Sequence, residues 1–183
     1  MVGCWRSENW SDEKEGLIAM QRSKEKITKR DLRKLLRLAR VDIDDFFERK
    51  PGYKRSYQGK ERLVALCQGA ALHYIDGKNG VKDFDVWFFY PQKGDVVLPY
   101  RRTGLTDFGK SKFGKHPKLP FFEGRGVDVL MRSTKYFNRG SPEACIVDYL
   151  SSRKSPTAKF LAQKAVVGLY PESVFGKILW PSS

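Results

Sequence analysis

The sequence predicts an α+β protein in which a small mixed sheet has helices before it and after it. Apolar residues recur at helical spacing after Thr28, and Ser-Pro steps introduce further helical segments near the end of the chain. Between them lie two short apolar runs, at 62–67 and 127–131, and a run at 82–90 that is rich in aromatic and β-branched residues. This order of helices, mixed elements and helices again is typical of the α+β class.

Helices are expected first. Thr28 and Asp31 form a capping-box pattern, and the apolar residues that follow share one face of a helix predicted over residues 28–40. A second, shorter helix is predicted over residues 42–49. The Pro51-Gly52 pair should end it, because proline and glycine both disfavour the interior of a helix.

The middle of the chain is expected to supply the sheet. Residues 62–67 predict a strand or the end of a helix, and Gly69-Ala70 open a short helix that reaches Ile75. A turn over residues 76–80 leads into 82–90, the most strand-like segment of the chain. Two further strands are predicted on either side of a long basic loop, in the order 96–100, loop 101–120 and 127–131.

Helices are expected again after the sheet. Ser141 followed by Pro142 predicts a helix start, and the helix should run through Leu150. Ser155-Pro156 predicts another helix that runs to about Ala165. A last short helix is predicted over the residues 174–179.

Length and composition indicate a folded intracellular protein. The 183 residues fit a helical segment over 1–60 and a core with C-terminal helices over 61–183, packed as one unit, with residues 1–24 irregular. Hydrophobic residues make up 40% of the chain, which excludes intrinsic disorder. No apolar run approaches the ~20 residues that span a bilayer, and residues 1–12 lack an apolar signal region. The three cysteines are far apart, which argues against a disulfide framework or a zinc site and favours a cytoplasmic location.

Net charge is the first indication of function. Thirty-five Lys and Arg against 21 Asp and Glu give a charge of +14, and a field of that sign attracts polyanions. The predicted helix over 28–40 carries basic residues opposite its apolar stripe, namely Arg30, Arg33, Lys34, Arg37 and Arg40. This face either contacts phosphates or is simply solvated.

Three aspartates in the predicted sheet are candidate metal ligands. Strand periodicity puts Asp83 and Asp85 on one face, where something positive, usually a divalent ion, should offset their repulsion. Asp128 lies between two valines in another predicted strand. If the two strands are neighbours, the three carboxylates converge and suit Mg²⁺, which keeps water and substrate phosphate in its remaining positions. Otherwise the pair of aspartates simply faces solvent.

At these residues the chain resembles the nucleotidyltransferase superfamily, which is built on a DNA polymerase β-like catalytic core. The family signature is a Gly-Gly or Gly-Ser pair that opens a helix, then Asp-x-Asp in a strand, then a third Asp in a later strand. Gly69-Ala70, Asp83-Phe84-Asp85 and Asp128 supply these pieces in order, with twelve residues between Ala70 and Asp83. The resemblance covers roughly residues 62–131 and suggests a minimal or divergent member.

The resemblance implies Mg²⁺-dependent transfer of a nucleotide from a nucleoside triphosphate to an acceptor hydroxyl. Asp83 and Asp85 would ligate two ions, and Asp128 would join the ion on the nucleophile side. The backbone at Gly69 and Ala70 would approach the triphosphate, but Ala70 lacks the hydroxyl of the family's usual serine. The chain could therefore be a weak or degenerate enzyme, and the acceptor stays open among RNA, protein and a small molecule.

A second phosphate-binding pattern lies in the basic loop. Residues 104–111 match the P-loop pattern G-x-x-x-x-G-K-[ST], but the glycines and prolines that follow disfavour the helix that a P-loop needs. The loop could instead hang over the aspartates. Lys110 and Lys112 would then hold the triphosphate or a nucleic-acid acceptor, and Phe108 and Phe113 would stack on bases. The alternative is a solvated loop.

Functions from different classes therefore compete. The first is the nucleotidyltransferase, whose partners are a nucleoside triphosphate and its acceptor. The second is a non-catalytic module of the same fold that binds RNA or DNA through its basic surface. A P-loop nucleoside triphosphatase, which would depend on Lys110, is a third. His73 is expected to be a packed helix histidine rather than a catalytic base.

Overall fold

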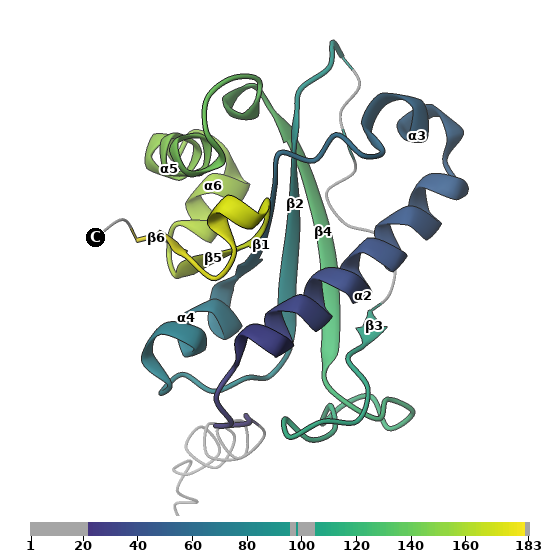
Figure 1. The fold of residues 1–183 in the computed structure, drawn as a ribbon, viewed down its shortest axis with the longest axis vertical. Helices are drawn as coiled ribbons and strands as arrows, with labels where there is room; N and C mark the ends of the chain where they lie inside the picture. The colour runs from purple at the N-terminus through teal and green to yellow at the C-terminus, as the bar shows by residue number, and fades with distance from the viewer. Residues whose placement is uncertain (1–21, 96–97, 99–104, 182–183) are drawn as a thin grey trace, which may run out of the picture.

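The chain folds around a mixed β-sheet (Figure 1). The computed structural model describes residues 22–95, 98 and 105–181. The strands in chain order are β1 Leu63–Cys67, β2 Phe84–Pro91, β3 Thr106–Asp107, β4 Gly126–Thr134, β5 Ala165–Tyr170 and β6 Ile178–Trp180. Their order across the sheet is β3-β4-β2-β1-β5-β6. With helices before and after this sheet, the predicted α+β class is confirmed.

Helices pack on both faces of the sheet. They are α2 Lys29–Glu48, α3 Pro51–Tyr57, α4 Gln68–Asp76, α5 Pro142–Ser152 and α6 Pro156–Leu161, with 3₁₀ turns at η1 Lys135–Phe137 and η2 Glu172–Val174. Figure 1 shows α2 running diagonally across β2 and β4. Alternate residues of β2 join two different cores: Phe84, Val86 and Phe88 pack with α2, whereas Trp87 and Phe89 pack with α5 and α6. Among the described helices, none is both long and apolar enough to cross a bilayer.

Strand β2 organises one end of the sheet. It pairs antiparallel with β1 and parallel with β4. Because of these directions, the end of β1 and the starts of β2 and β4 lie together at the same end of the sheet, where α4 begins. The register there pairs Cys67 with Asp85, and Asp85 with Asp128.

Most predicted elements are confirmed. The strand-like runs at 62–67, 82–90 and 127–131 form β1, β2 and β4, and β4 continues three residues further, to Thr134. Gly69-Ala70 lies in the first turn of α4. The side-chain oxygens of Ser141 and Ser155 accept backbone N–H bonds that start α5 and α6.

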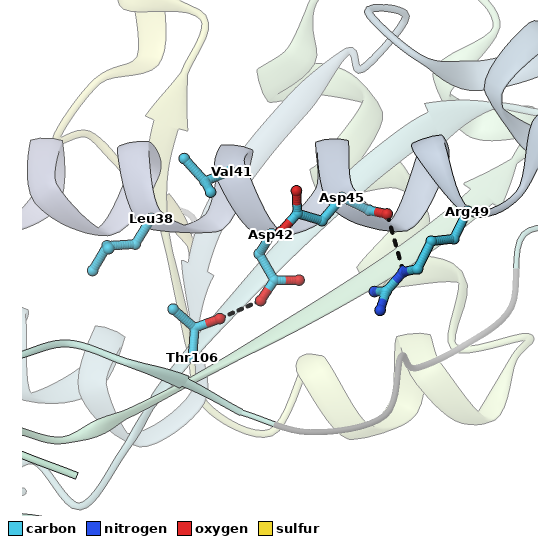
Figure 2. A pocket seen from close by; sticks show the side chains of 6 residues that line it. All are labelled: Leu38, Val41, Asp42, Asp45, Arg49 and Thr106. Atoms are coloured by element: carbon cyan, nitrogen blue, oxygen red, sulfur yellow. Dashed lines mark hydrogen bonds between the residues drawn. The ribbon is translucent and has the colours of Figure 1, made fainter.

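The two helices predicted before the sheet are one continuous helix, α2. Its predicted start is confirmed, because the Thr28 N–H donates to the Asp31 carboxylate at 2.8 Å and the Asp31 N–H donates to the Thr28 hydroxyl at 3.3 Å. The predicted break near Asp42 is wrong. Asp42 is a buried residue of α2, and its carboxylate accepts a hydrogen bond from the hydroxyl of Thr106 (Figure 2). Asp42 therefore fastens the edge strand β3 to the helix.

The Pro51-Gly52 pair begins a helix rather than only ending one. Helix α2 stops at Glu48, and Pro51 occupies the first position of α3. The absent N–H of proline costs nothing at that position, because the first N–H groups of a helix have no intrahelical partner.

The C-terminal region differs most from the prediction. The helix expected to reach Ala165 ends at Leu161, and residues 165–170 form β5, buried between β1 and β6. The helix expected over 174–179 is wrong, because Val174 closes a 3₁₀ turn and the chain then forms β6. Strand β5 pairs with β1, far earlier in the chain, and β6 pairs with β5, so no local pattern reveals either strand.

The basic loop is partly described. The strand predicted at 96–100 lies outside the described residues except for Leu98, as do the first four residues of the loop over 101–120. Phe108 and Phe113, expected to stack on bases, are each only 1% exposed. Their rings pack on Phe84 with centroid distances of 5.0 and 5.3 Å, so they close the core beneath the sheet.

Gly168 supplies a test of the packing around β5. A Cβ atom at this position would lie 2.3 Å from the carbonyl oxygen of Val174, whereas a Cβ at Gly52 in α3 would meet nothing within 4 Å. We therefore expect Gly168→Ala to lower the free energy of unfolding by about 1–3 kcal/mol, as overpacking does. Gly52→Ala should leave it unchanged or raise it by up to about 1 kcal/mol. Urea denaturation of the two variants checks this, and equal midpoints would contradict the described packing.

Candidate functional site

The candidate site is a pocket at the end of the sheet where β1 gives way to α4 and β2 begins. Its volume is about 230 Å³. Gly69 and Ala70 from α4 line it together with Asp83 and Asp85 from the start of β2. The remaining lining residues are Arg22, Gln68, Gly80, Lys82, Phe160, Gln163 and Lys164. Four of the sequence-predicted site residues therefore share one pocket.

The turn from β1 into α4 is held by contacts from elsewhere in the chain. Gln68 has φ +62°, a left-handed conformation that favours glycine. Its buried side chain donates from Nε2 to the Phe160 carbonyl at 3.2 Å. A non-glycine residue in this region costs about 1–3 kcal/mol and occurs often at functional sites. The sequence carries no signal for this role, because the strain appears only in three dimensions.

Gly69 lets the following turn pack against the start of α4. The side-chain Nδ2 of Asn79 donates to the Gly69 carbonyl at 2.9 Å, and a Cβ on Gly69 would lie 3.2 Å from that nitrogen. Residues with larger side chains would therefore displace Asn79. The N-terminal end of α4 carries a partial positive charge and backbone N–H groups, which suit a phosphate oxygen.

The three predicted aspartates lie near one another but in different environments. Asp83 precedes β2 with a side chain 36% exposed, and Asp85 is half-buried within the strand. Asp128 is buried and is the register partner of Asp85 on the parallel neighbour β4. Paired residues of adjacent strands point to the same face at a strand spacing of about 4.8 Å. The two strands are thus neighbours, which is the condition on which the predicted convergence depends, although Asp128 is not among the residues that line the pocket.

Three cationic residues line the pocket beside the carboxylates: Arg22, Lys82 and Lys164. The Lys82 ammonium lies 3.5 Å from the Asp83 carboxylate, and Arg22 donates to the Asn79 carbonyl at 3.4 Å. Sequence reasoning did not single out these cations, because they come from separate segments and no spacing connects them. They place positive charge where a triphosphate would need it.

A buried basic pair lies within electrostatic reach of Asp83. Arg125 and His116 are both buried, and Arg125 donates from Nε to the Phe113 carbonyl at 2.8 Å. Burial lowers the pKa of His116, while the negative charge of Asp83 partly opposes this by favouring the protonated ring. Burial likewise lowers the pKa of Arg125, again against the effect of Asp83. Asp83 therefore interacts with positive charge from two directions: from the cations that line the pocket and from Arg125 in the connection between β3 and β4.

Two other residues near the pocket are structural. Burial, with a smaller contribution from Asp85, raises the pKa of the Cys67 thiol well above its usual range, so it is a poor nucleophile at neutral pH. His73 is buried, its Nδ1 accepts the Gly80 N–H at 2.9 Å, and its Nε2 lies 3.1 Å from the Glu25 carbonyl. His73 is thus a packed helix histidine, as the sequence predicts.

Asp83 and Asp85 are the carboxylates of this pocket that could hold a metal ion. Over residues 22–95, 98 and 105–181, no three His, Cys, Asp or Glu side chains form a group close enough to hold an ion. Mg²⁺ does not require such a cage, since it commonly takes one or two carboxylates and completes its shell with water and substrate phosphates. Asp83 and Asp85 supply two carboxylates to one pocket, which fits that pattern.

The structure does not bring Lys110 or Lys112 into this pocket. The Lys112 ammonium lies 3.0 Å from the Asp31 carboxylate at the start of α2, and Lys110 is exposed. The P-loop pattern lacks its helix here, because turns follow Ser111 in the described chain. Asp107 within that pattern instead accepts backbone N–H bonds from Gly109 and Gly124.

Comparisons with known proteins gave no match: no protein-family model, no curated protein and no solved structure matches this chain. Function is therefore inferred from the geometry and chemistry of the pocket.

The electrostatic contact between Asp83 and His116 can be measured directly. Asp83→Asn removes a negative charge that favours the protonated ring, so we expect the pKa of His116 to fall. The chain has only two histidines, so NMR titration of the ring protons resolves both. Asp95→Asn, an exposed neutralisation outside the pocket, should leave the His116 pKa unchanged. An unchanged or raised His116 pKa in Asp83→Asn would contradict the described geometry.

The same shift has a stability consequence. Because the pKa of His116 is lower in the folded chain than its ordinary value of 6.5, the unfolded chain binds more protons as the pH falls through that value. His116 should therefore reduce stability below about pH 6.5. This destabilisation should be larger in Asp83→Asn, and denaturant titrations on both sides of that pH check it.

Proposed function

We propose that this chain is a nucleotidyltransferase that moves a nucleotide from a nucleoside triphosphate onto an acceptor hydroxyl in the presence of Mg²⁺. The observation that carries the proposal is the shared pocket of Gly69, Ala70, Asp83 and Asp85. It joins a helix N-terminus, which suits phosphate, to carboxylates on a sheet, which suit Mg²⁺. The pairing of Asp128 with Asp85 adds a third carboxylate in the order that the family resemblance requires.

Each residue has a role that its position supports. Asp83 and Asp85 would hold Mg²⁺, which when bound would offset charge on the leaving pyrophosphate and polarise the acceptor hydroxyl. Asp128, buried beside Asp85, would add negative charge that favours release of the acceptor proton. The backbone N–H groups at Gly69 and Ala70 would donate to triphosphate oxygens.

The pocket also offers contacts for the rest of the nucleotide. The cations Arg22, Lys82 and Lys164 would neutralise the phosphates that lie outside the helix terminus. Phe160 lines the pocket and is 47% exposed, so its ring is available to stack on a base. These four residues take the place that sequence reasoning gave to Lys110, Lys112 and the aromatic residues of the basic loop.

A second function, binding without transfer, is favoured by one observation. Ala70 stands where the family commonly has a residue with a hydroxyl or no side chain, and Ala70 is buried. The hydroxyl contact to phosphate is therefore missing, while the net charge of +14 still attracts nucleic acid. A degenerate module would keep salt-sensitive binding of RNA or DNA and lack Mg²⁺-dependent transfer.

Pyrophosphate release tests the proposal. We expect the native chain, given Mg²⁺, the common nucleoside triphosphates and an RNA acceptor, to release pyrophosphate and extend or label the RNA. Asp85→Asn should lower this rate by about hundredfold or more, the scale seen when one preorganised polar group is removed from an active site. Because asparagine has nearly the same size and shape as aspartate, the variant should fold like the native chain, and circular dichroism checks this.

Asp95→Asn provides the matched control, since it makes the same chemical change at an exposed turn outside the pocket. It should retain the native rate. Equal rates for Asp85→Asn and the native chain would refute the carboxylate assignment. RNA binding without pyrophosphate release from the native chain would favour the degenerate module.

A further inference from the structure

A second hollow lies on the face of the sheet opposite Asp85, between α2 and the β3–β4 connection. Its volume is about 500 Å³, and we call it the α2 groove. Four cationic residues of α2 line it: Arg30, Arg33, Lys34 and Arg37. Phe108, Ser111 and a single acidic residue, Asp31, complete the described lining. The lining thus combines four positive side chains with one negative side chain.

The four cations form one stripe because of their spacing. Positions 30, 33, 34 and 37 are three or four residues apart, so they share one face of the helix. From first to last they extend about 10 Å along the axis at 1.5 Å per residue. Arg30 and Arg37, at the two ends, are both exposed.

The inner cations are positioned by aromatic rings, which attract a cation without cancelling its charge. The Arg33 guanidinium lies 4.4 Å from the ring centroid of Phe175, and the Lys34 ammonium lies 4.3 Å from that of Phe108. The ion pair of Arg33 with Glu172 at 3.3 Å is exposed on both sides and therefore weak.

The single carboxylate of the groove is already engaged. Asp31 accepts hydrogen bonds from the backbone and the hydroxyl of Thr28, at 2.8 and 2.7 Å. It also lies 3.0 Å from the Lys112 ammonium, which adds a fifth cation at the edge of the groove. Partial burial acts to raise the pKa of Asp31, but these contacts outweigh it and lower that pKa, so the carboxylate stays ionised and committed to the helix cap. The excess positive charge of the stripe remains available to a ligand.

We propose that the α2 groove binds the phosphate backbone of a single-stranded nucleic acid. Guanidinium forks spaced along a helix match a row of phosphates, and arginine is the residue best suited to hold phosphate with two hydrogen bonds. The groove is a recess between a helix and a loop, which a flexible single strand can enter more readily than a stiff duplex. This surface acts independently of nucleotidyl transfer, because it involves none of the residues of the Asp85 pocket.

Salt-dependent binding measures the contribution of the groove. The probe is a fluorescein-labelled single-stranded RNA of about 15 nucleotides, followed by anisotropy over a range of KCl concentrations. We expect Arg30→Gln/Arg37→Gln to weaken binding and to reduce the slope of log affinity against log salt by about 1.4, or about 0.7 for each phosphate that the variant no longer neutralises. Neither side chain has a described ion pair, and both are exposed, so the fold should be retained.

Lys50→Gln/Arg55→Gln is the matched control. It likewise removes two positive charges, from exposed positions just before α3 and within it. It should keep the native slope and nearly the native affinity. The proposal is overturned if the two double variants weaken binding equally, if Arg30→Gln/Arg37→Gln binds like the native chain, or if duplex RNA of the same sequence binds more tightly than the single strand.

Discussion

The parallel pairing of β2 with β4 is the constraint on which the candidate site depends. It sets Asp85 beside Asp128, while Phe84 and Val86 on one strand and Val129 on the other point into the core beneath α2. A shift of either strand by one residue would turn its aspartate into that apolar core. The same shift would turn Phe84, Val86 and Val129 away from that core, so the apolar pattern of the strands fixes the register and with it the position of the charges.

The sheet also separates two kinds of chemistry. On the face that carries Asp85, a small pocket joins carboxylates, a helix terminus and three cations. On the other face, α2 presents a stripe of cations over a groove with little negative charge. Phe108 connects this groove to the core beneath α2, because its ring packs on Phe84 of β2 and also lies under the Lys34 ammonium. The same core that fixes the strands thus also positions the basic stripe of α2.

Local patterns predict much of this molecule, and non-local contacts account for what they do not predict. The aromatic run at 82–90 and the Ser-Pro helix starts depend on neighbours in sequence, so composition and spacing reveal them. The predicted helix boundary at Asp42 is wrong because this buried residue of α2 bonds to Thr106, which is 64 residues away in the chain and cannot be foreseen from local sequence. The aspartates and Gly69 share a pocket as the motif order implies, but Lys164 joins them only because β5 folds back beside β1. Phe108 and Phe113 look like surface aromatics in a basic loop until the closure of the core places them inside.

Calorimetric titration of a nucleoside triphosphate into the native chain and into Asp83→Asn/Asp85→Asn, each with and without Mg²⁺, tests the central claim most directly. If the pocket is a metal-dependent nucleotide site, the native chain binds only with Mg²⁺ and the double variant does not bind. Both chains should keep the same affinity for single-stranded RNA, because the α2 groove is unchanged. Binding that needs no Mg²⁺, binding that the double variant retains, or no binding by the native chain would contradict the assignment of the aspartates.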